Sequence, residues 1–209
     1  MKIIFLPGLG QDAAVWNNVI AHLNTELSTE SLNLFSDIDE NTEVTLDLLN
    51  KKVDKKLRMI NEPYILCGLS LGGILALSIA PKQNDFLQGL IVSGAQFESP
   101  NKLLIDLQNL MFRFMPSKNF SELGMTKKQM IRFCQSMKSL NLRSGLTELT
   151  IPTTIICGTK DKANLSAAKS LSSVISNSEL KLIAGGHMLN EEKPLEFANT
   201  INSFYAKYF

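Results

Sequence analysis

Residues 64–77 read YILCGLSLGGILAL, and this stretch decides the fold. An apolar run typical of a strand leads into Ser70, and a second apolar run typical of a buried helix follows it. A sharp turn from strand to helix brings the positions two before and two after the central residue into collision, so both need glycine. Residues 68–72, GLSLG, therefore match the pattern G-x-S-x-G, which lifts a serine hydroxyl above the edge of a sheet. A helix packed closely on a strand through glycine would give a similar string.

Short apolar runs alternate with helical patterns along most of the chain. Strands are predicted at residues 2–7, 31–35, 64–68, 90–93, 153–157 and 180–183, and helices at 13–23, 43–60, 71–79, 164–175 and 194–207. Strands that are apolar throughout and separated by helices indicate a parallel sheet covered on both faces. We therefore expect an α/β fold with about six mostly parallel strands flanked by helices.

The alternation is interrupted once, after the fourth predicted strand. Residues 96–149 show helical patterns only, including a capping box at residues 126–129. We expect this segment to form a short helical cap near the C-terminal edge of the strands, where open α/β sheets bind ligands. The predicted domain organisation is a core made of residues 1–95 and 150–209, with the cap inserted at 96–149.

A serine hydroxyl needs a base before it can act as a nucleophile near neutral pH. His187 follows a predicted strand on a glycine-rich loop, whereas the other histidine, His22, lies inside a predicted helix. Asp161 also follows a predicted strand, where it can orient the His187 ring or simply cap the next helix. The chain order Ser70, Asp161, His187 and their shared edge of the sheet predict a nucleophile, an orienting acid and a base.

The oxyanion formed by attack of Ser70 requires hydrogen-bond donors. One expected donor is the backbone N–H of Leu71, which opens the helix after the serine. The second is the N–H of Leu9, since the loop after the first strand neighbours the nucleophile strand in a doubly wound sheet. Gly8 and Gly10 allow close approach of the backbone there, and they also suit a plain turn.

The amino-acid composition limits which partners and which cellular compartment we expect. The 209 residues carry a net charge of +1 and are 44% hydrophobic, which gives no general reason to expect nucleic acid or a membrane as partner. The three cysteines lack metal-ligand spacing, which favours reduced thiols and no metal or cofactor. The sequence has neither a long apolar span nor a signal-type N-terminus, so we expect a cytoplasmic protein. Residues 99–150 hold eight Lys or Arg and three acidic residues, which suits an anionic substrate or a solvated helix surface.

Nearly the whole chain resembles the α/β-hydrolase superfamily, in the branch of small esterases, lactonases and carbon–carbon bond hydrolases. The resembling segments are residues 3–23 with the oxyanion loop, 65–80 with the nucleophile turn, 146–161 with the strand ending at the acid, and 185–204 with the histidine. Two features depart from the family. Pro7 stands where the family usually has a histidine that supports the oxyanion loop, and the sequence opens on the strand that precedes this loop.

Together, the predicted triad and the resemblance suggest a serine hydrolase that cleaves a small ester or thioester through an acyl-enzyme. Lactonase, carbon–carbon hydrolase or lyase activity remains open, because the cap and pocket decide the reaction on this fold. A non-catalytic small-molecule receptor also remains open, supported by the replacement at Pro7. The expected partner is a small-molecule ester or acyl substrate, bound by a monomer or a homodimer.

Overall fold

The computed structural model describes residues 1–82, 85–99, 102–121 and 123–209. Within these residues six strands form one sheet in the order β2-β1-β3-β4-β5-β6, and all neighbouring strands are parallel. The strands are β1 (Lys2–Leu6), β2 (Ser28–Ser31), β3 (Tyr64–Leu69), β4 (Leu87–Ser93), β5 (Thr153–Gly158) and β6 (Ser178–Ile183). The predicted parallel sheet is confirmed.

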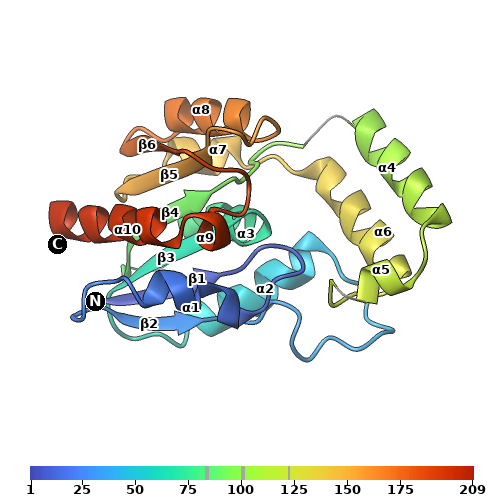
Figure 1. Cartoon of the computed structure of the whole chain (residues 1–209), viewed down its shortest axis with the longest axis horizontal. Helices are drawn as coiled ribbons and strands as arrows, with labels where there is room; N and C mark the ends of the chain where they lie inside the picture. Colours follow the sequence, from blue (N-terminus) through green and yellow to red (C-terminus); the bar gives the residue numbers. More distant parts are fainter. Residues whose placement is uncertain (83–84, 100–101, 122) are drawn as a thin grey trace.

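Helices cover both faces of the sheet. They are α1 (Asn17–Ile20), α2 (Leu46–Leu57), α3 (Leu71–Ile79), α8 (Leu165–Val174), α9 (Leu189–Glu192) and α10 (Pro194–Tyr208), with the 3-10 turns η1 (Ala13–Trp16) and η2 (Ala80–Lys82). Figure 1 shows α1, α9 and α10 on the near face of the sheet, with α2 and α3 behind it. Among the described residues, no helix is both long and apolar enough to cross a bilayer.

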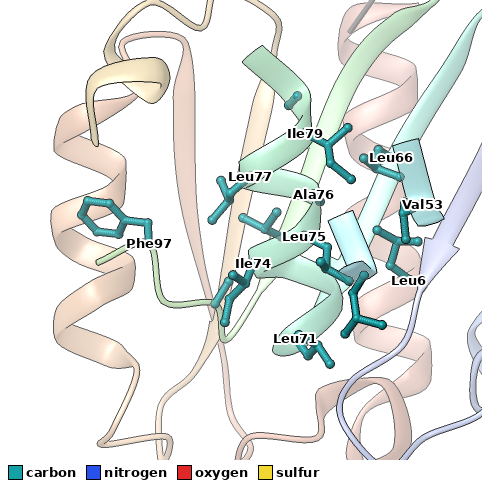
Figure 2. Packing of buried hydrophobic residues seen from close by; sticks show 14 of the residues in the cluster. Leu6, Val53, Leu66, Leu71, Ile74, Leu75, Ala76, Leu77, Ile79 and Phe97 are labelled. Atoms are coloured by element: carbon teal, nitrogen blue, oxygen red, sulfur yellow. The ribbon is translucent and has the colours of Figure 1, made fainter. Parts of the chain in front are cut away.

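Each face of the sheet buries its own apolar cluster, because successive residues of a strand point to opposite sides. In β1, Ile4 and Leu6 join the cluster that contains α2, α3 and α8, whereas Ile3 and Phe5 join the cluster beneath α1 and α10. Figure 2 shows the first cluster, in which the apolar side chains of α3 lie beside Leu66 of β3. Strand β3 is buried along its whole length and therefore holds the following turn at the centre of the molecule.

The edge strand β2 differs from the prediction, which placed a strand at residues 31–35. The strand is Ser28–Ser31, a polar and partly exposed segment whose pairing ends where the Leu32 N–H donates to Phe5 O at 3.0 Å. The apolar residues that suggested a strand serve another purpose, since Leu34 enters the core from a loop. An edge strand with one exposed side does not need apolar residues, so hydrophobic pattern misplaced it.

Between β4 and β5 the chain forms the helical cap. It comprises α4 (Lys102–Phe114), α5 (Lys118–Ser121), α6 (Lys127–Ser136) and α7 (Arg143–Thr147), with the 3-10 turn η3 (Met137–Ser139). Figure 1 shows α4, α5 and α6 set to one side of the core, at the end of the sheet toward which β1 runs. The capping box is confirmed, with Thr126 and Gln129 exchanging side-chain to backbone hydrogen bonds. The exact boundaries of the cap, 96–149, stay a prediction.

Gln129 also fastens α6 to the long loop before α2. Its Nε2 donates to Asp39 O at 2.9 Å and to Thr42 O at 3.0 Å, and the residue is buried. Replacing Gln129 by alanine removes these bonds, so we expect the free energy of unfolding to fall by about 1–3 kcal/mol in urea titrations. The exposed Gln135 of the same helix provides the control. Alanine at Gln135 should change the free energy of unfolding by less than about 0.5 kcal/mol. Equal effects of the two substitutions would contradict this role.

Candidate active site

Ser70 occupies the turn between β3 and α3 in a backbone conformation that L-residues rarely adopt. Its φ is 52° and its ψ is −113°. The Ser70 N–H donates to Ser93 O at 2.7 Å, and Ser70 O accepts the Ile74 N–H at 2.9 Å, so the turn is held on both sides. Strain of this kind costs about 1–3 kcal/mol and concentrates at functional sites. The backbone therefore marks Ser70 as the centre of the candidate site.

The glycines beside Ser70 leave no room for a side chain. A Cβ atom on Gly68 would lie 2.4 Å from Gly72 O, and one on Gly72 would lie 2.1 Å from Leu6 O. Both obstructing atoms belong to the backbone, so neither can move aside as a flexible side chain would. The start of α3 thus lies against β1 and β3 at a distance that only glycine permits.

Alanine at Gly72 should therefore lower the free energy of unfolding by about 3 kcal/mol or more, because its methyl group would force β1 and α3 apart. Urea unfolding followed by circular dichroism measures the change. Gly145 is the matched control, because a Cβ there would first meet the Pro81 side chain at 3.3 Å. We expect alanine at Gly145 to alter the free energy by no more than about 1 kcal/mol. A Gly72→Ala protein of unchanged stability would refute the tight turn.

Asp161 and His187 meet at one edge of the sheet, Asp161 after β5 and His187 after β6. Asp161 Oδ2 lies 2.6 Å from His187 Nδ1. The Asp161 side chain is 5% exposed and the His187 side chain 35%, so a buried carboxylate faces a ring that solvent can reach. A carboxylate at Nδ1 favours the tautomer that carries its proton there, which leaves Nε2 able to accept one.

Two residues that sequence reasoning did not single out support this carboxylate, Asn164 directly and Gln96 through Asn164. Asn164 Nδ2 lies 2.9 Å from each carboxylate oxygen of Asp161 and 3.2 Å from His187 Nδ1. Gln96 Nε2 in turn donates to Asn164 Oδ1 at 2.8 Å. The residue that precedes α8 is Asn164, so Asp161 does not cap that helix and the capping alternative is wrong. The position of Asn164, three residues after the acid on a turn, was the available sequence signal.

The end of β4 lies between the serine and the histidine. Ser93 O accepts the Ser70 N–H, and a Cβ on the next residue, Gly94, would lie 2.9 Å from both Cε1 and Nδ1 of His187. Ser70 and His187 therefore border adjacent residues of one strand end. In the part of the chain that the structure describes, the His187 ring pairs with Asp161 through Nδ1, and no hydrogen bond joins it to the Ser70 hydroxyl. The structure thus pairs the acid with the histidine and places the serine nearby without pairing it.

The two predicted oxyanion donors lie in the loop after β1 and at the start of α3. Leu71 is the first residue of α3, so its N–H has no acceptor within the helix. Leu9 lies in the loop after β1, where the neighbouring Gly8 N–H donates to Gln11 Oε1 at 2.8 Å. Across the described ranges, no acceptor is bonded to the N–H of Leu9 or of Leu71.

The loop after β1 lies between the nucleophile turn and the cap. A Cβ on Gly72 would lie 2.7 Å from Pro7 O, and one on Gly10 would lie 2.6 Å from Leu123 Cδ2 of the cap. A cavity of about 420 Å³ opens beside this loop, lined by residues 10–12 and 33–36 and by Ser121, Leu123 and Gly124 of the cap. A small molecule would therefore have room next to the loop that bears Leu9.

Two cysteines lie on strands that bear the site, Cys67 on β3 and Cys157 on β5. Burial raises the pKa of Cys67, and burial together with the nearby charge of Asp161 raises the pKa of Cys157 to about 11. Both thiols therefore stay protonated near neutral pH, and the thiolate is the reactive form of cysteine. Ser70 is the better candidate for a nucleophile.

Comparison with sequences of known proteins gives two related matches. The family model described as serine aminopeptidase, S33, matches residues 33–141, a range that contains Ser70 but not Asp161 or His187. Among curated proteins, 3-oxoadipate enol-lactonase 1 from Acinetobacter baylyi is 24% identical over 234 aligned positions, which cover 97% of this chain and 87% of that protein.

Solved structures agree with the fold over the whole chain. The enol-lactonase from Burkholderia xenovorans superposes with a TM-score of 0.85 at 16% identity, covering 98% of this chain and 91% of that one. MenH from S. aureus superposes with a TM-score of 0.82 at 19% identity, covering 100% of this chain and 94% of the other. At these identities the likeness is one of architecture.

Proposed function

Since the chain belongs to the serine aminopeptidase S33 family within the α/β-hydrolases, we propose that it is a serine hydrolase that cleaves a small ester or thioester through an acyl-enzyme. The observation that supports this most is the contact of Asp161 with His187. This contact lies beside the end of β4, where Ser93 O accepts the N–H of the strained Ser70. Acyl transfer of this kind uses a nucleophile, a base and an orienting acid, and these three residues follow three different strands whose ends lie at one edge of the sheet.

In the proposed first half-reaction, Ser70 Oγ attacks the carbonyl carbon of the substrate while its proton passes to His187 Nε2. Asp161, 2.6 Å from Nδ1, stabilises the imidazolium that forms. The oxyanion accepts hydrogen bonds from the N–H groups of Leu9 and Leu71. The tetrahedral intermediate then expels the alcohol or thiol, which takes the proton from His187 Nε2 and leaves an acyl group on Ser70.

The second half-reaction repeats these roles with water. His187 Nε2 takes a proton from a water molecule, whose oxygen attacks the acyl carbon. The same two N–H groups hold the second oxyanion. Collapse of this intermediate breaks the bond to Ser70 Oγ, which recovers its proton from His187, and releases a carboxylic acid.

The cavity beside the oxyanion loop has room for part of a small substrate, and its wall includes Gly10 and Gln11 of that loop but neither Ser70 nor His187. Its volume is about 420 Å³. Its wall combines apolar side chains such as Leu34, Phe35 and Leu123 with polar ones such as Asn33. Ligand sites of small molecules commonly have this size and mixture. The prediction of an anionic substrate rests on the basic excess of the cap, where three lysines line a second cavity of about 590 Å³.

Hydrolysis of a lactone is the second candidate. The curated enol-lactonase that aligns with 97% of this chain favours it. A lactone is a cyclic ester, so the same residues would act in the same order. The difference is that the leaving hydroxyl remains part of the acyl group, so the acyl-enzyme carries it and water releases a single hydroxy acid.

A panel of p-nitrophenyl esters, matching thioesters and small lactones tests the proposal, with the Ser70→Ala protein as blank. We expect turnover of short-chain esters or thioesters by the wild-type protein. Turnover of lactones alone would favour the second candidate. Tight binding of a panel compound without turnover, and without covalent labelling by a fluorophosphonate, would instead favour a receptor and overturn the proposal.

A further inference from the structure

Gln11 joins the loop that bears Leu9 to the segment that follows His187. Its Oε1 accepts the Gly8 N–H at 2.8 Å. Its Nε2 lies 3.2 Å from Glu191 Oε2 and 3.5 Å from Asn190 Oδ1. One side chain therefore connects the loop after β1 to α9, about 180 positions away in the sequence.

Gln11 holds two neighbouring peptide groups of the oxyanion loop, the first through its side chain and the second through its backbone. Its side chain binds the N–H of the peptide between Pro7 and Gly8. Its own backbone N–H donates to Gly8 O at 3.2 Å, and this carbonyl belongs to the same peptide group as the Leu9 N–H. Since the C=O and N–H of a peptide group point in opposite directions, holding the carbonyl toward Gln11 turns the Leu9 N–H away from it.

Glycine makes this support necessary. Gly8 and Gly10 flank Leu9, and a glycine backbone rotates more freely than that of any other residue. The residue before Gly8 is Pro7, which has neither an N–H nor a polar side chain with which to hold the loop. Gln11 is the side chain that binds the Gly8 N–H within the described part of the chain.

The other end of Gln11 contacts α9, which is partly buried. Asn190 is fully buried, and its Nδ2 lies 3.5 Å from Gln11 Oε1, so the two amides face each other. Both Asn190 and Glu191 belong to α9, whose preceding residue, Met188, directly follows His187. A shift of the oxyanion loop would thus disturb contacts with the segment that bears the base.

We propose that Gln11 is a positioning residue whose side chain fixes the Pro7–Gly8 peptide, and through it the orientation of the neighbouring Leu9 N–H, relative to the segment that follows His187. This inference rests on the proposed function, because it assigns Leu9 to the oxyanion. Gln11 contacts no reacting atom and acts through Gly8 and α9.

Alanine at Gln11 should lower kcat on the best ester by about 10²-fold, comparable with the loss of one oxyanion donor. KM should change by less than about threefold, because the lost interaction belongs to the transition state. The affinity for a trifluoromethyl ketone analogue of that ester, which forms an oxyanion on the serine, should fall by a similar factor. Alanine at the exposed Gln135 is the matched control and should leave kcat unchanged.

Exchanging the amide of Gln11 with the carboxylate of Glu191 distinguishes a hydrogen-bonding role from a packing role. Gln11→Glu keeps an acceptor for the Gly8 N–H but places a second carboxylate beside Glu191, so kcat should fall. The double variant Gln11→Glu with Glu191→Gln restores one donor and one acceptor, and should recover kcat to within about fivefold of the wild type. This rescue can be measured even if the alanine variant does not fold.

Two results separate this inference from the proposed function. Unchanged kcat in folded Gln11→Ala protein, or a folded double variant that shows no rescue, would overturn the positioning role while Ser70→Ala still abolishes turnover. Full turnover by the Ser70→Ala protein would overturn the proposed function itself. Melting temperatures of all variants show which of them are folded.

Discussion

Alanine at Ser70 should lower kcat by about 10³–10⁶-fold on any ester that the protein hydrolyses. The substitution removes one oxygen atom from a partly buried turn, so the fold should remain intact. All covalent chemistry in the proposed mechanism passes through this oxygen, which is why the expected loss is so large. Steady-state kinetics with the purified variant measure it, and alanine at the exposed Ser166 is the control.

Glycine at Ser70 adds an independent check on the strained turn. The φ of 52° costs free energy in alanine as in serine, but glycine adopts it readily. Ser70→Gly should therefore be more stable than Ser70→Ala by about 1–3 kcal/mol, while both are inactive. Equal stability would mean that the turn is relaxed. Wild-type turnover in either variant would remove Ser70 from the mechanism.

Asparagine at Asp161 should lower kcat by about 10⁴-fold. The amide has nearly the shape of the carboxylate, but its NH₂ group can face His187 Nδ1 as a donor. The ring would then carry its proton on Nε2, where it could not accept the proton of Ser70. The kinetics should be measured across pH. A loss confined to kcat, in a variant with a native circular dichroism spectrum, identifies the tautomer effect.

The control for this substitution is asparagine at Asp47, an exposed carboxylate on α2 that pairs with Lys51 at 2.7 Å. It should leave kcat unchanged, because surface ion pairs of this kind contribute little. If Asp161→Asn also kept its turnover, the carboxylate would have no part in orienting the base, and the contact with His187 would be structural only.

Much of the fold was predictable because a parallel sheet buried on both faces needs strands that are apolar throughout. β3 and β5 are buried along their whole length, with apolar side chains over most of it, and were placed to within one residue of their observed ends. β2 was misplaced for the opposite reason, since an edge strand needs fewer apolar residues and the run that looked like a strand packs from a loop. Local pattern is informative where burial is complete and weak where it is partial.

The candidate site was predictable only in part. Glycine spacing identified Ser70, and a position just after a strand identified Asp161 and His187, two residues that the structure brings into contact. Gln11 and Asn164 were missed because their roles depend on hydrogen bonds to distant or neighbouring loops, and a polar residue in a loop has many ordinary uses. For Gln11, whose partners on α9 lie about 180 positions away, no local motif encodes the contact.

Peptide mapping by mass spectrometry after reaction with a fluorophosphonate tests the central claim most directly. The account predicts a single covalent adduct, located on Ser70, absent from the Ser70→Ala protein and formed much more slowly by the Asp161→Asn protein. An active preparation that forms no adduct on Ser70, or that is labelled and inhibited at another residue, would contradict it.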